Sequence, residues 1–522
     1  MLNPRGLKMS DSVRSLRRLI QENTRIQKGA KIEIDYVDVT HALSDASTRQ
    51  NHVIFGRRGC GKSLLLEKVR KGLPSQIRAI YINCEDYKHH TFPNVLIEIL
   101  DAVFAEIEQH LGGWFGKKKE LRELVNQLRD ELAGLRKQQD EQTSKVTRKA
   151  EVGDKAEIDL GSSIPHAKAG LALSSTRKES IEAEYQKFDD KIRELNQLLP
   201  RLKKLMEKFF ILSTKVEVIF VQLDDFYQLR RPIQPYVVDY IHRLCKDVPL
   251  FFKIGTLRHG SSLYADRDRQ PIGAQERNDY QPINIDYTLA DFKKTSILIN
   301  KILQEYGAKA GMSEAEIESL FKGDGFKRLV LASGGVPRDF LSLLLEALAV
   351  KDTGDERIGK DDVRSLSLGT FQRRIEELKS DSEEKDHDVL IRGIYAIRKF
   401  CLDRKTNVFL VPDRTLQEKS AIKDLLSRLL DYRIIHSVGS ALTHKSQSGT
   451  FTAYMIDIGA YANLRKLANR FKEIDITAND AKEQCRNAPI LEGTTLEGFF
   501  TSAPLNVEHA LIQEVEALDE SE

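Results

Sequence analysis

The sequence contains few of the residues that build disulfide frameworks or metal sites. Its cysteines are scattered, without a Cys-x-x-Cys pair and without histidines at ligand spacing. They are Cys60, Cys84, Cys245, Cys401 and Cys485. This pattern indicates neither a zinc site nor a set of disulfides, and we expect reduced thiols.

Long apolar runs and an excess of one charge are also lacking. No run of about 18 apolar residues, which a membrane-spanning helix needs, occurs in the sequence, and the polar N-terminus has no apolar signal-peptide core. The 81 basic and 78 acidic residues nearly cancel, so no global field attracts nucleic acid or an anionic membrane. We expect a cytoplasmic protein of several domains without membrane contact, whose nucleic-acid contacts, if any, are local.

A glycine-rich motif follows the short apolar segment at residues 53–55. The motif, GRRGCGKS at residues 56–63, fits G-x-x-x-x-G-K-[ST], and a helix-like segment follows it. In this context backbone N–H groups would surround phosphate oxygens, Lys62 would reach the β and γ phosphates, and Ser63 would bind Mg²⁺. The predicted nucleotide contacts are Gly56, Arg57, Arg58, Gly59, Cys60, Gly61, Lys62, Ser63 and Leu64.

An acid pair ends the apolar run at residues 216–223. This run predicts a strand buried on both faces, and Asp224 and Asp225 follow it directly. We assign Asp224 to the Mg²⁺ shell, directly or through water, and Asp225 to polarising the attacking water. Because Asp225 has a shorter reach than the glutamate ordinarily found at its position, we expect slow hydrolysis.

Further strand and helix patterns alternate around these motifs. Residues 77–87 predict a strand, residues 92–107 an amphipathic helix, and residues 248–259 another apolar strand. Such alternation favours an open, parallel α/β sheet that binds its ligand at the carboxyl ends of the strands.

The order of these motifs resembles the AAA+ ATPases, at the border between the origin-recognition initiators and the STAND signalling ATPases. Residues 56–63 match Walker A, LDD at residues 223–225 matches Walker B with Asp in place of Glu, and YINCEDY at residues 81–87 resembles an initiator strand. The resemblance implies an α/β P-loop NTPase that binds ATP and Mg²⁺, hydrolyses ATP and carries a helical lid.

The resemblance also implies sensors for the γ-phosphate. GTLRH at residues 255–259 falls at the sensor 1 position, where Thr256 and Arg258 fit the T-x-R of STAND proteins. GGVPRD at residues 334–339 resembles the start of the lid helix, with Pro337 in its first turn and Arg338 as sensor 2, or as an ordinary surface arginine. In an oligomer, one of three arginines would act as a finger in the neighbouring subunit; the candidates are Arg267, Arg269 and Arg277.

Residues 112–212 interrupt the predicted sheet. Apolar residues step alternately by four and three from Leu121 to Leu135 and again from Ile181 to Phe209, which predicts an antiparallel coiled-coil hairpin kinked at Pro200. At its tip, residues 155–176 alternate with period two, as in a β-hairpin. A tip for partner recognition, a β assembly between subunits, a membrane-active element and a flexible loop remain alternatives.

The C-terminal third resembles a winged helix over residues 385–465. Residues 420–430 would form its recognition helix and residues 440–450 its wing tip. Basic residues that could bind duplex DNA are Lys419, Lys423, Arg428, His444 and Lys445. The alternative, known from STAND-like ATPases, is a domain that packs on the nucleotide domain as an intramolecular lock.

These patterns together predict seven segments. They are an N-terminal segment with the first part of the ATPase core (1–111), the coiled-coil insertion (112–212), the second part of the core (213–282), the helical lid (283–350), a charged linker with one helix in its middle (351–384), the winged helix (385–465) and an acidic tail (466–522).

The leading functional hypothesis is an oligomeric, ATP-dependent switch that acts on DNA or on an effector protein held by the coiled-coil arm. The resemblance to stand-alone ATPases with coiled-coil insertions implies a role in prokaryotic antiphage defence. One alternative is a replication or mobile-element initiator that grips duplex DNA with the winged helix. Another is a scaffold that binds ATP as a structural ligand without hydrolysing it.

Overall fold

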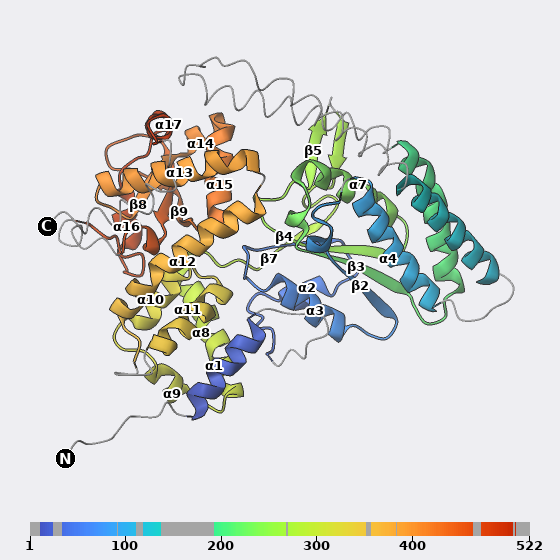
Figure 1. The fold of residues 1–522 in the computed structure, drawn as a ribbon, viewed down its shortest axis with the longest axis horizontal. Helices are drawn as coiled ribbons and strands as arrows, with labels where there is room; N and C mark the ends of the chain where they lie inside the picture. Colours follow the sequence, from blue (N-terminus) through green and yellow to red (C-terminus); the bar gives the residue numbers. More distant parts are fainter. Residues whose placement is uncertain are drawn as a thin grey trace, which may run out of the picture. The chain divides into compact units, whose positions relative to one another are not determined.

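The computed structural model describes residues 11–24, 34–90, 92–110, 118–136, 193–267, 270–350, 357–382, 384–462, 471–504 and 507. The described chain divides into two compact units (Figure 1). The first, here called the sheet unit, comprises Ala42–Phe55 and Leu65–Asn284. The second, the C-terminal unit, comprises Met1–His41, Gly56–Leu64 and Ile285–Glu522. The glycine-rich motif therefore belongs to the same unit as the C-terminal half of the chain.

The sheet unit is built on a parallel sheet of five strands with the order β2-β3-β4-β1-β7. The strands are β1 (His52–Phe55), β2 (Ile77–Asn83), β3 (Val218–Asp224), β4 (Leu250–Thr256) and β7 (Gln281–Asn284). Every residue of β3 is buried, as the apolar run predicted. The predicted parallel α/β sheet is confirmed, whereas β7 was missed because it is short and carries Pro282, which is tolerated at the sheet edge.

The register of the sheet places the ends of its strands at one edge. Asn83 of β2 pairs with Asp224 of β3, and Phe55 of β1 pairs with Thr256 of β4. Because all five strands are parallel, their carboxyl ends share this edge, where open α/β sheets bind ligands. Gly56, the first residue of the glycine-rich motif, directly follows β1 in the chain.

Helices and a hairpin complete the sheet unit. The helices are α2 (Ala42–Ala46), α3 (Lys62–Gly72, which starts in the C-terminal unit), α4 (Asn94–His110), α7 (Gln234–Cys245) and the short 3₁₀ turns η1 (Cys84–Tyr87), η3 (Phe226–Gln228) and η4 (Arg231–Ile233). The strands β5 (Tyr264–Arg267) and β6 (Gln270–Gly273) form an antiparallel pair beside α7. One apolar core joins the sheet to α4 and α7.

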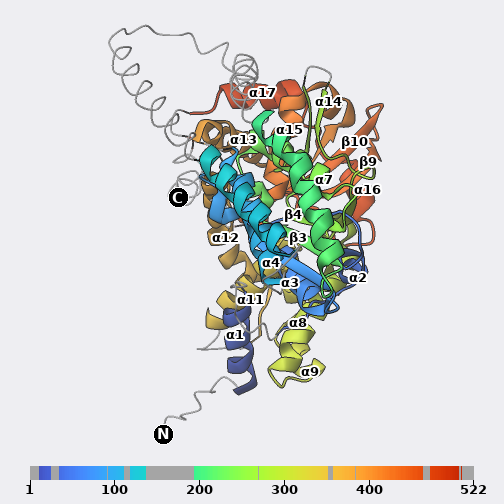
Figure 2. The same ribbon diagram turned by 90° about the vertical axis from the view of Figure 1, so that its right-hand side faces the viewer.

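The described part of the insertion consists of two helical segments, residues 118–136 and 193–212. They lie beside α4 (Figures 1 and 2). Their heptad positions are buried in the core of the sheet unit, among them Leu121, Val125, Leu202 and Phe209. Arg201 of the second segment pairs with Glu131 of the first at 2.6 Å. The base of the insertion therefore belongs to the core, and Pro200 lies within a continuous helix; the predicted tip, residues 155–176, lies outside the described residues.

The first half of the C-terminal unit is helical. Its elements are α1 (Asp11–Asn23), η5 (Leu289–Asp291), α8 (Phe292–Lys309), α9 (Glu314–Ser319), α10 (Gly325–Ala332), α11 (Pro337–Val350) and α12 (Lys360–Asp381). Helix α11 begins at Pro337, as predicted from its missing N–H group.

Helix α12 is the helix predicted within the charged segment at residues 351–384, but the prediction that this segment is a linker is wrong for α12. This helix buries Val363, Phe371 and Leu378 in the core and contacts both α10 and α11. Its composition was misleading because its buried face also carries polar residues, among them Ser367 and Arg374, so the sequence lacks a clear apolar stripe.

The second half of the C-terminal unit contains a three-stranded antiparallel sheet with the order β8-β10-β9. Its elements are α13 (Glu384–Asp403), β8 (Val408–Pro412), α14 (Asp413–Glu418), α15 (Ser420–Asp431), β9 (Ile435–Thr443), β10 (Thr450–Ile456), η7 (Ile458–Ala460), α16 (Ala481–Arg486) and α17 (Gly493–Thr501). The helix predicted at residues 420–430 is α15.

The prediction of an acidic tail from residue 466 onward is wrong for its first half. Ile474, Cys485, Leu491 and Leu496 are buried in the core of the C-terminal unit, and α17 packs on α13. The strongly acidic residues that suggested a tail, 514–522, lie outside the described residues.

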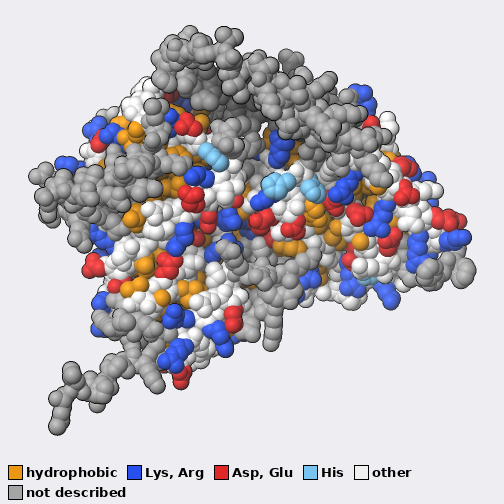
Figure 3. All heavy atoms as spheres, in the orientation of Figure 1, with side chains coloured by type: hydrophobic (Ala, Val, Ile, Leu, Met, Phe, Trp, Pro, Cys, Tyr) orange, Lys and Arg blue, Asp and Glu red, His pale blue; other side chains and the backbone are white. Residues whose placement is uncertain are grey.

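The surface carries both signs of charge. On the face shown in Figure 3, Lys and Arg side chains lie among Asp and Glu side chains and form no single large basic patch. Within the ranges that the structure describes, no helix combines the length and the apolar character needed to cross a bilayer.

Candidate functional site

The glycine-rich motif forms a loop whose shape requires two of its glycines. Gly59 and Gly61 have φ angles of +90° and +94°, a left-handed region that side chains disfavour. A Cβ atom on Gly59 would lie 2.9 Å from atoms of both Val336 and Arg338, so the loop also packs too closely there for a side chain. Helix α3 begins at Lys62, which places the loop at a helix N-terminus, a favourable position for anions.

Lys62 folds back over its own loop. Its ammonium group donates hydrogen bonds to the carbonyl oxygens of Gly56 at 2.8 Å and Arg57 at 3.3 Å, and the residue is 5% exposed. The positive charge therefore lies over the loop, where the ammonium group could donate its hydrogen bonds to phosphate oxygens instead.

Arg57 is held by an acid that the sequence patterns did not identify. Its guanidinium group forms a two-pronged ion pair with Asp286, with N–O distances of 2.8, 2.9 and 3.0 Å. It also donates to the carbonyl oxygens of Tyr287 and Gly334. The predicted contact between Arg57 and a nucleotide receives no support from this geometry, because the side chain is committed to Asp286.

Asp286 in turn fixes the backbone of the loop. Its carboxylate accepts the N–H of Arg57 at 3.2 Å and the thiol of Cys60 at 3.4 Å. Burial alone would raise the pKa of Asp286, but the charge and hydrogen bonds of Arg57 outweigh it and hold that pKa below its usual value. Burial and the nearby Asp286 raise the pKa of Cys60, so this thiol stays protonated.

Arg58 is tied to the C-terminal half of the chain. Its side chain pairs with Asp381, the last residue of α12, at 2.6 Å. Its carbonyl oxygen accepts a hydrogen bond from Arg433, the second residue after α15, at 2.6 Å. Arg433 is itself buried and pairs with Asp339 of α11 at 3.1 Å and with Glu377 of α12.

The start of α11 touches the loop through its backbone. The N–H of Arg338 donates to the carbonyl oxygen of Gly59 at 3.3 Å. Arg338, the predicted sensor 2 residue, thus contacts the loop through its backbone. The successive loop residues 57, 58 and 59 all form hydrogen bonds or ion pairs with residues of the C-terminal half of the chain, between positions 286 and 433.

Buried charges extend this network away from the loop. Arg374 of α12 pairs with Asp339 at 2.8 Å and with Asp457, and Asp457 also contacts His436 of β9 at 3.2 Å. Desolvation lowers the pKa of His436 to about 4 despite the opposing effect of Asp457, so this imidazole is neutral at pH 7. Sequence reasoning missed these residues because their partners lie far apart in the chain.

The acid pair lies at the carboxyl end of β3 in the sheet unit. Asp224 is 1% exposed, and among the described residues no Lys, Arg or His lies within ion-pair distance of it. One carboxylate oxygen accepts the N–H of Asp225 at 2.9 Å, and the other accepts the hydroxyl of Tyr81 at 2.7 Å. Asp225 has left-handed backbone angles and begins η3. Asp224 is thus a buried carboxylate without a countercharge, as a metal ligand would be.

The predicted sensor 1 residues lie at the end of β4, where Thr256 is the last residue of the strand and Arg258 follows it. Thr256 is buried and hydrogen-bonds Ser261. Arg258 pairs with Glu276 at 2.8 Å and lies over the ring of Phe55 at 4.3 Å. Its predicted contact with a γ-phosphate therefore requires it to leave Glu276, and remains a prediction.

Two of the three candidate finger arginines lie in the described part of the chain. Arg267 ends β5, and Arg277 lies in a turn with a φ angle of +69°. Arg269 lies outside the described residues.

The oxygen donors in these two regions suit the predicted cofactor. Mg²⁺ prefers oxygen ligands and keeps several of its waters, so it needs few ligands from a protein. The Ser63 hydroxyl in the C-terminal unit and the Asp224 carboxylate in the sheet unit are each an oxygen donor of this kind. Each unit taken by itself therefore offers an oxygen donor of the kind that Mg²⁺ binds.

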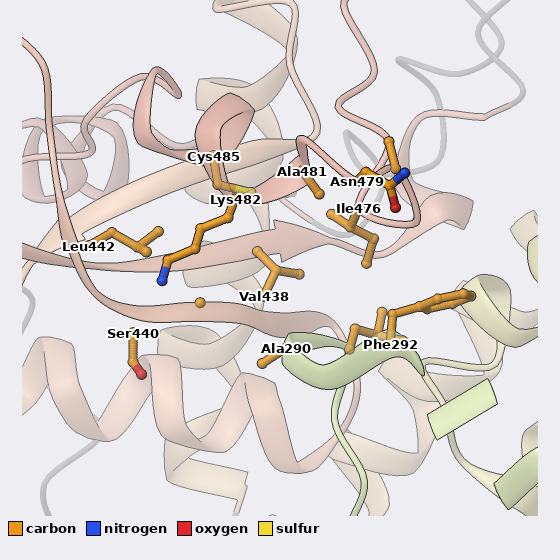
Figure 4. A pocket seen from close by; sticks show the side chains of 13 residues that line it. Ala290, Phe292, Val438, Ser440, Leu442, Ile476, Asn479, Ala481, Lys482 and Cys485 are labelled. Carbon is orange, nitrogen blue, oxygen red and sulfur yellow. The ribbon is translucent and has the colours of Figure 1, made fainter. Parts of the chain in front are cut away.

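A separate pocket of about 390 Å³ lies in the C-terminal unit (Figure 4). Strand β9 contributes Val438 and Ser440, helix α16 contributes Lys482, and the entry to α8 contributes Phe292. The lining combines apolar side chains with the polar side chains of Ser440, Asn479 and Lys482. It shares no residue with the glycine-rich loop, so the pocket is a feature distinct from that loop.

Comparison with known proteins gives only distant similarities. No protein-family model matches the sequence, and neither does any curated protein. A solved structure of a RuvB variant from Thermotoga maritima matches 81% of this chain and 91% of its own, with 12% identity and a TM-score of 0.29. A structure of Drosophila ORC bound to DNA matches 80% of this chain and 89% of its own, with 11% identity and a TM-score of 0.28.

The class of fold follows from the arrangement of strands, loop and helix in this chain. A parallel sheet, a glycine-rich loop directly after β1 and a helix that begins at the lysine of that loop together form an α/β P-loop fold.

Proposed function

We propose that the protein is an ATP-binding and ATP-hydrolysing switch of the AAA+/STAND type. The observation that carries this proposal is the way the loop is held: residues 57, 58 and 59 each bond to the C-terminal half of the chain, through Asp286, Asp381 with Arg433, and Arg338. A ligand that rearranges the loop must disturb these bonds. The loop is therefore suited to report the state of its ligand.

The nucleotide would bind two conformational states of the loop with different affinities. Lys62 now donates to the carbonyl oxygens of Gly56 and Arg57, and we propose that the β and γ phosphates of ATP take over these hydrogen bonds. When Lys62 no longer donates to the carbonyl oxygen of Arg57, the loop loses a hydrogen bond at Arg57. The backbone N–H of this residue is the one that Asp286 holds. A ligand shifts a conformational equilibrium only by its difference in affinity for the two states, and the γ-phosphate supplies that difference.

The residues for hydrolysis are the ones predicted from the sequence. Ser63 and Asp224 would hold Mg²⁺, which when bound neutralises charge on the phosphates. Asp225 would orient the attacking water, with the slow turnover expected of its short side chain. Arg258 and Arg338 would contact the γ-phosphate as sensors.

The C-terminal domain, α13 to β10, serves in this proposal as an intramolecular lock. Its order of helix, strand, two helices and two strands is that of a winged helix. Three of the five basic residues predicted to bind DNA are instead engaged in ion pairs in the structure. Arg428 pairs with Asp386 and Lys419 with Glu497, both at 2.8 Å, and Lys445 pairs with Glu483 at 3.4 Å. Arg433, directly beyond α15, bonds the loop at Arg58.

The test is equilibrium binding of ATP and ADP combined with the mass of the particle in each nucleotide. We expect wild-type protein to bind both nucleotides and to change its mass or shape between them. Lys62→Ala should lose at least about 10-fold in ATP affinity, since charge-assisted hydrogen bonds to phosphate are lost. The matched control is Lys71→Ala, an exposed lysine on the same helix, which should bind like wild type. Equal ATP affinity in Lys62→Ala would refute the proposal.

The lock is tested with Arg58→Ala, which removes the bridge to Asp381. We expect this variant to adopt the ATP-dependent form at lower ATP concentration, because one bond that opposes loop rearrangement is gone. Arg49→Ala removes a mostly exposed ion pair with Glu217 and is the control. An unchanged ATP dependence in Arg58→Ala would show that the contact is not a lock.

The partners and the biological role are proposed on the family resemblance. We propose a homo-oligomer in its ATP form and an effector protein bound to the coiled-coil arm, with a role in prokaryotic antiphage defence. Co-purification of an effector with wild-type protein, but not with a variant lacking residues 137–192, tests the arm. Steady-state ATPase assays separate this switch from a scaffold that never hydrolyses ATP.

Binding of duplex DNA is a second candidate function, favoured by the exposure of Lys423 on α15 and of Lys445 beyond β9. Affinity for duplex DNA that falls with salt, and falls further in Lys423→Glu, would support it. Affinity unaffected by Lys423→Glu and Lys445→Glu would exclude this surface.

A further inference from the structure

Tyr81 of β2 holds the carboxylate of Asp224 from the neighbouring strand. Its hydroxyl donates to one oxygen of that carboxylate at 2.7 Å. In the parallel register Tyr81 pairs with Gln222, two residues before Asp224, so the three side chains project on the same face of the sheet. Gln222 marks that face, because its amide donates to the carbonyl oxygen of Leu66 in α3, the helix that follows the glycine-rich loop.

The phenol can only act as a donor here. An ionised carboxylate only accepts hydrogen bonds, so the phenol hydroxyl must be the donor to Asp224. The other oxygen of Asp224 accepts the N–H of Asp225. Each oxygen thus receives one hydrogen bond and retains a lone pair, since a carboxylate offers about four acceptor positions.

A buried carboxylate without a cationic neighbour is free to rotate unless such bonds fix it. Asp224 has no cationic partner among the described residues, and Tyr81 provides the side-chain hydrogen bond that orients it. Partners of this kind around metal ligands set the ligand's orientation and typically account for about 10- to 100-fold in metal affinity.

We propose that Tyr81 is a positioning residue for the Mg²⁺-binding carboxylate of Asp224. The inference rests on the proposed function, in which Asp224 belongs to the Mg²⁺ shell. Tyr81 touches neither nucleotide nor metal; it holds the carboxylate in the rotamer that presents its remaining lone pairs to the ion. Losing the hydroxyl should weaken the Mg²⁺-dependent part of nucleotide binding and leave the Mg²⁺-independent part unchanged.

The experiment compares wild type with Tyr81→Phe, which keeps the ring and removes only the hydroxyl. Equilibrium binding of a fluorescent ATP analogue is measured as Mg²⁺ is varied, and again in EDTA, so that no turnover is needed. We expect Tyr81→Phe to need about 10-fold more Mg²⁺ for half-maximal enhancement of binding. In EDTA its affinity should equal that of wild type. The matched control is Tyr87→Phe in η1, whose ring contacts His90.

Several outcomes would overturn the inference. Identical Mg²⁺ dependence in wild type and Tyr81→Phe would show that the hydroxyl does not position the carboxylate. An equal loss with Mg²⁺ and in EDTA would assign Tyr81 a purely structural role. A wild-type protein that binds the nucleotide without any Mg²⁺ dependence would instead refute the assignment of Asp224, and with it part of the proposed function.

Discussion

Replacing Asp286 by alanine tests how strongly the glycine-rich loop is clamped. The carboxylate is 17% exposed and pairs with the guanidinium of Arg57, which is 7% exposed. It also accepts hydrogen bonds from the backbone of Arg57 and the thiol of Cys60. Removing one partner of a buried ion pair costs about 3–5 kcal/mol, because the other charge remains buried without compensation. Part of this cost is relieved here, since Arg57 keeps its bonds to two carbonyl oxygens.

We therefore expect Asp286→Ala to lose about 3 kcal/mol of stability in the C-terminal unit, a large share of the 5–15 kcal/mol typical of folded proteins. Two units can unfold separately, so a single transition would not report on one of them. Hydrogen exchange of peptides from residues 285–350 measures this unit by itself.

The control for this variant is Asp388→Ala. Asp388 is 67% exposed and pairs with Arg392 on the surface of α13, a kind of pair worth at most about 1 kcal/mol. The double variant Arg57→Met, Asp286→Leu should recover much of the lost stability, because an apolar pair needs no countercharge. If Asp286→Ala and Asp388→Ala differ by less than about 1 kcal/mol, the reasoning that this pair clamps the loop is refuted.

Three further predictions concern the C-terminal unit. Gly59→Ala should lower stability by about 1–3 kcal/mol through its left-handed backbone, whereas Gly369→Ala, in open space within α12, should raise it by up to about 1 kcal/mol; thermal melting measures both. The pKa of His436 is about 4 in the folded protein and 6.5 when unfolded, so the unfolded chain takes up the proton first. Urea titrations should show stability falling by up to about 3 kcal/mol between pH 6.5 and pH 4, and a flatter profile in His436→Gln. Phe371→Ala should cost about 3–5 kcal/mol if α12 belongs to the core, while the exposed Val350→Ala should change stability by less than about 0.5 kcal/mol in the same assay.

Local patterns were sufficient for the central elements of the sheet and for the loop. The fully apolar run before Asp224 predicted a buried strand, and the glycines and lysine of the motif predicted a loop at the start of a helix. These signals are local because they depend on a few consecutive residues with restricted backbone or solvation preferences. The predicted sites themselves, including Asp225 and Arg258, stay predictions until nucleotide binding is measured.

The short edge strand β7 and the burial of helix α12 could not be predicted in the same way. Strand β7 is four residues long, and its Pro282 argues against a strand unless the edge position is known. The sequence of helix α12 resembles that of a solvent-exposed helix, because charged and hydroxyl side chains share its buried face with Phe371. Arg374 is tolerated there only because Asp339 and Asp457, distant in the chain, compensate its charge.

The sequence by itself determined the parallel α/β sheet, the glycine-rich loop and the acid pair, since each depends on neighbouring residues. Only the tertiary structure decided what holds the loop. The side chain of Arg57 is held by Asp286, and Arg58 is joined to Asp381 and Arg433 from more than 300 residues away. Such pairings arise when a packed core excludes water and buried charges must find partners wherever the fold places them, which no local pattern records.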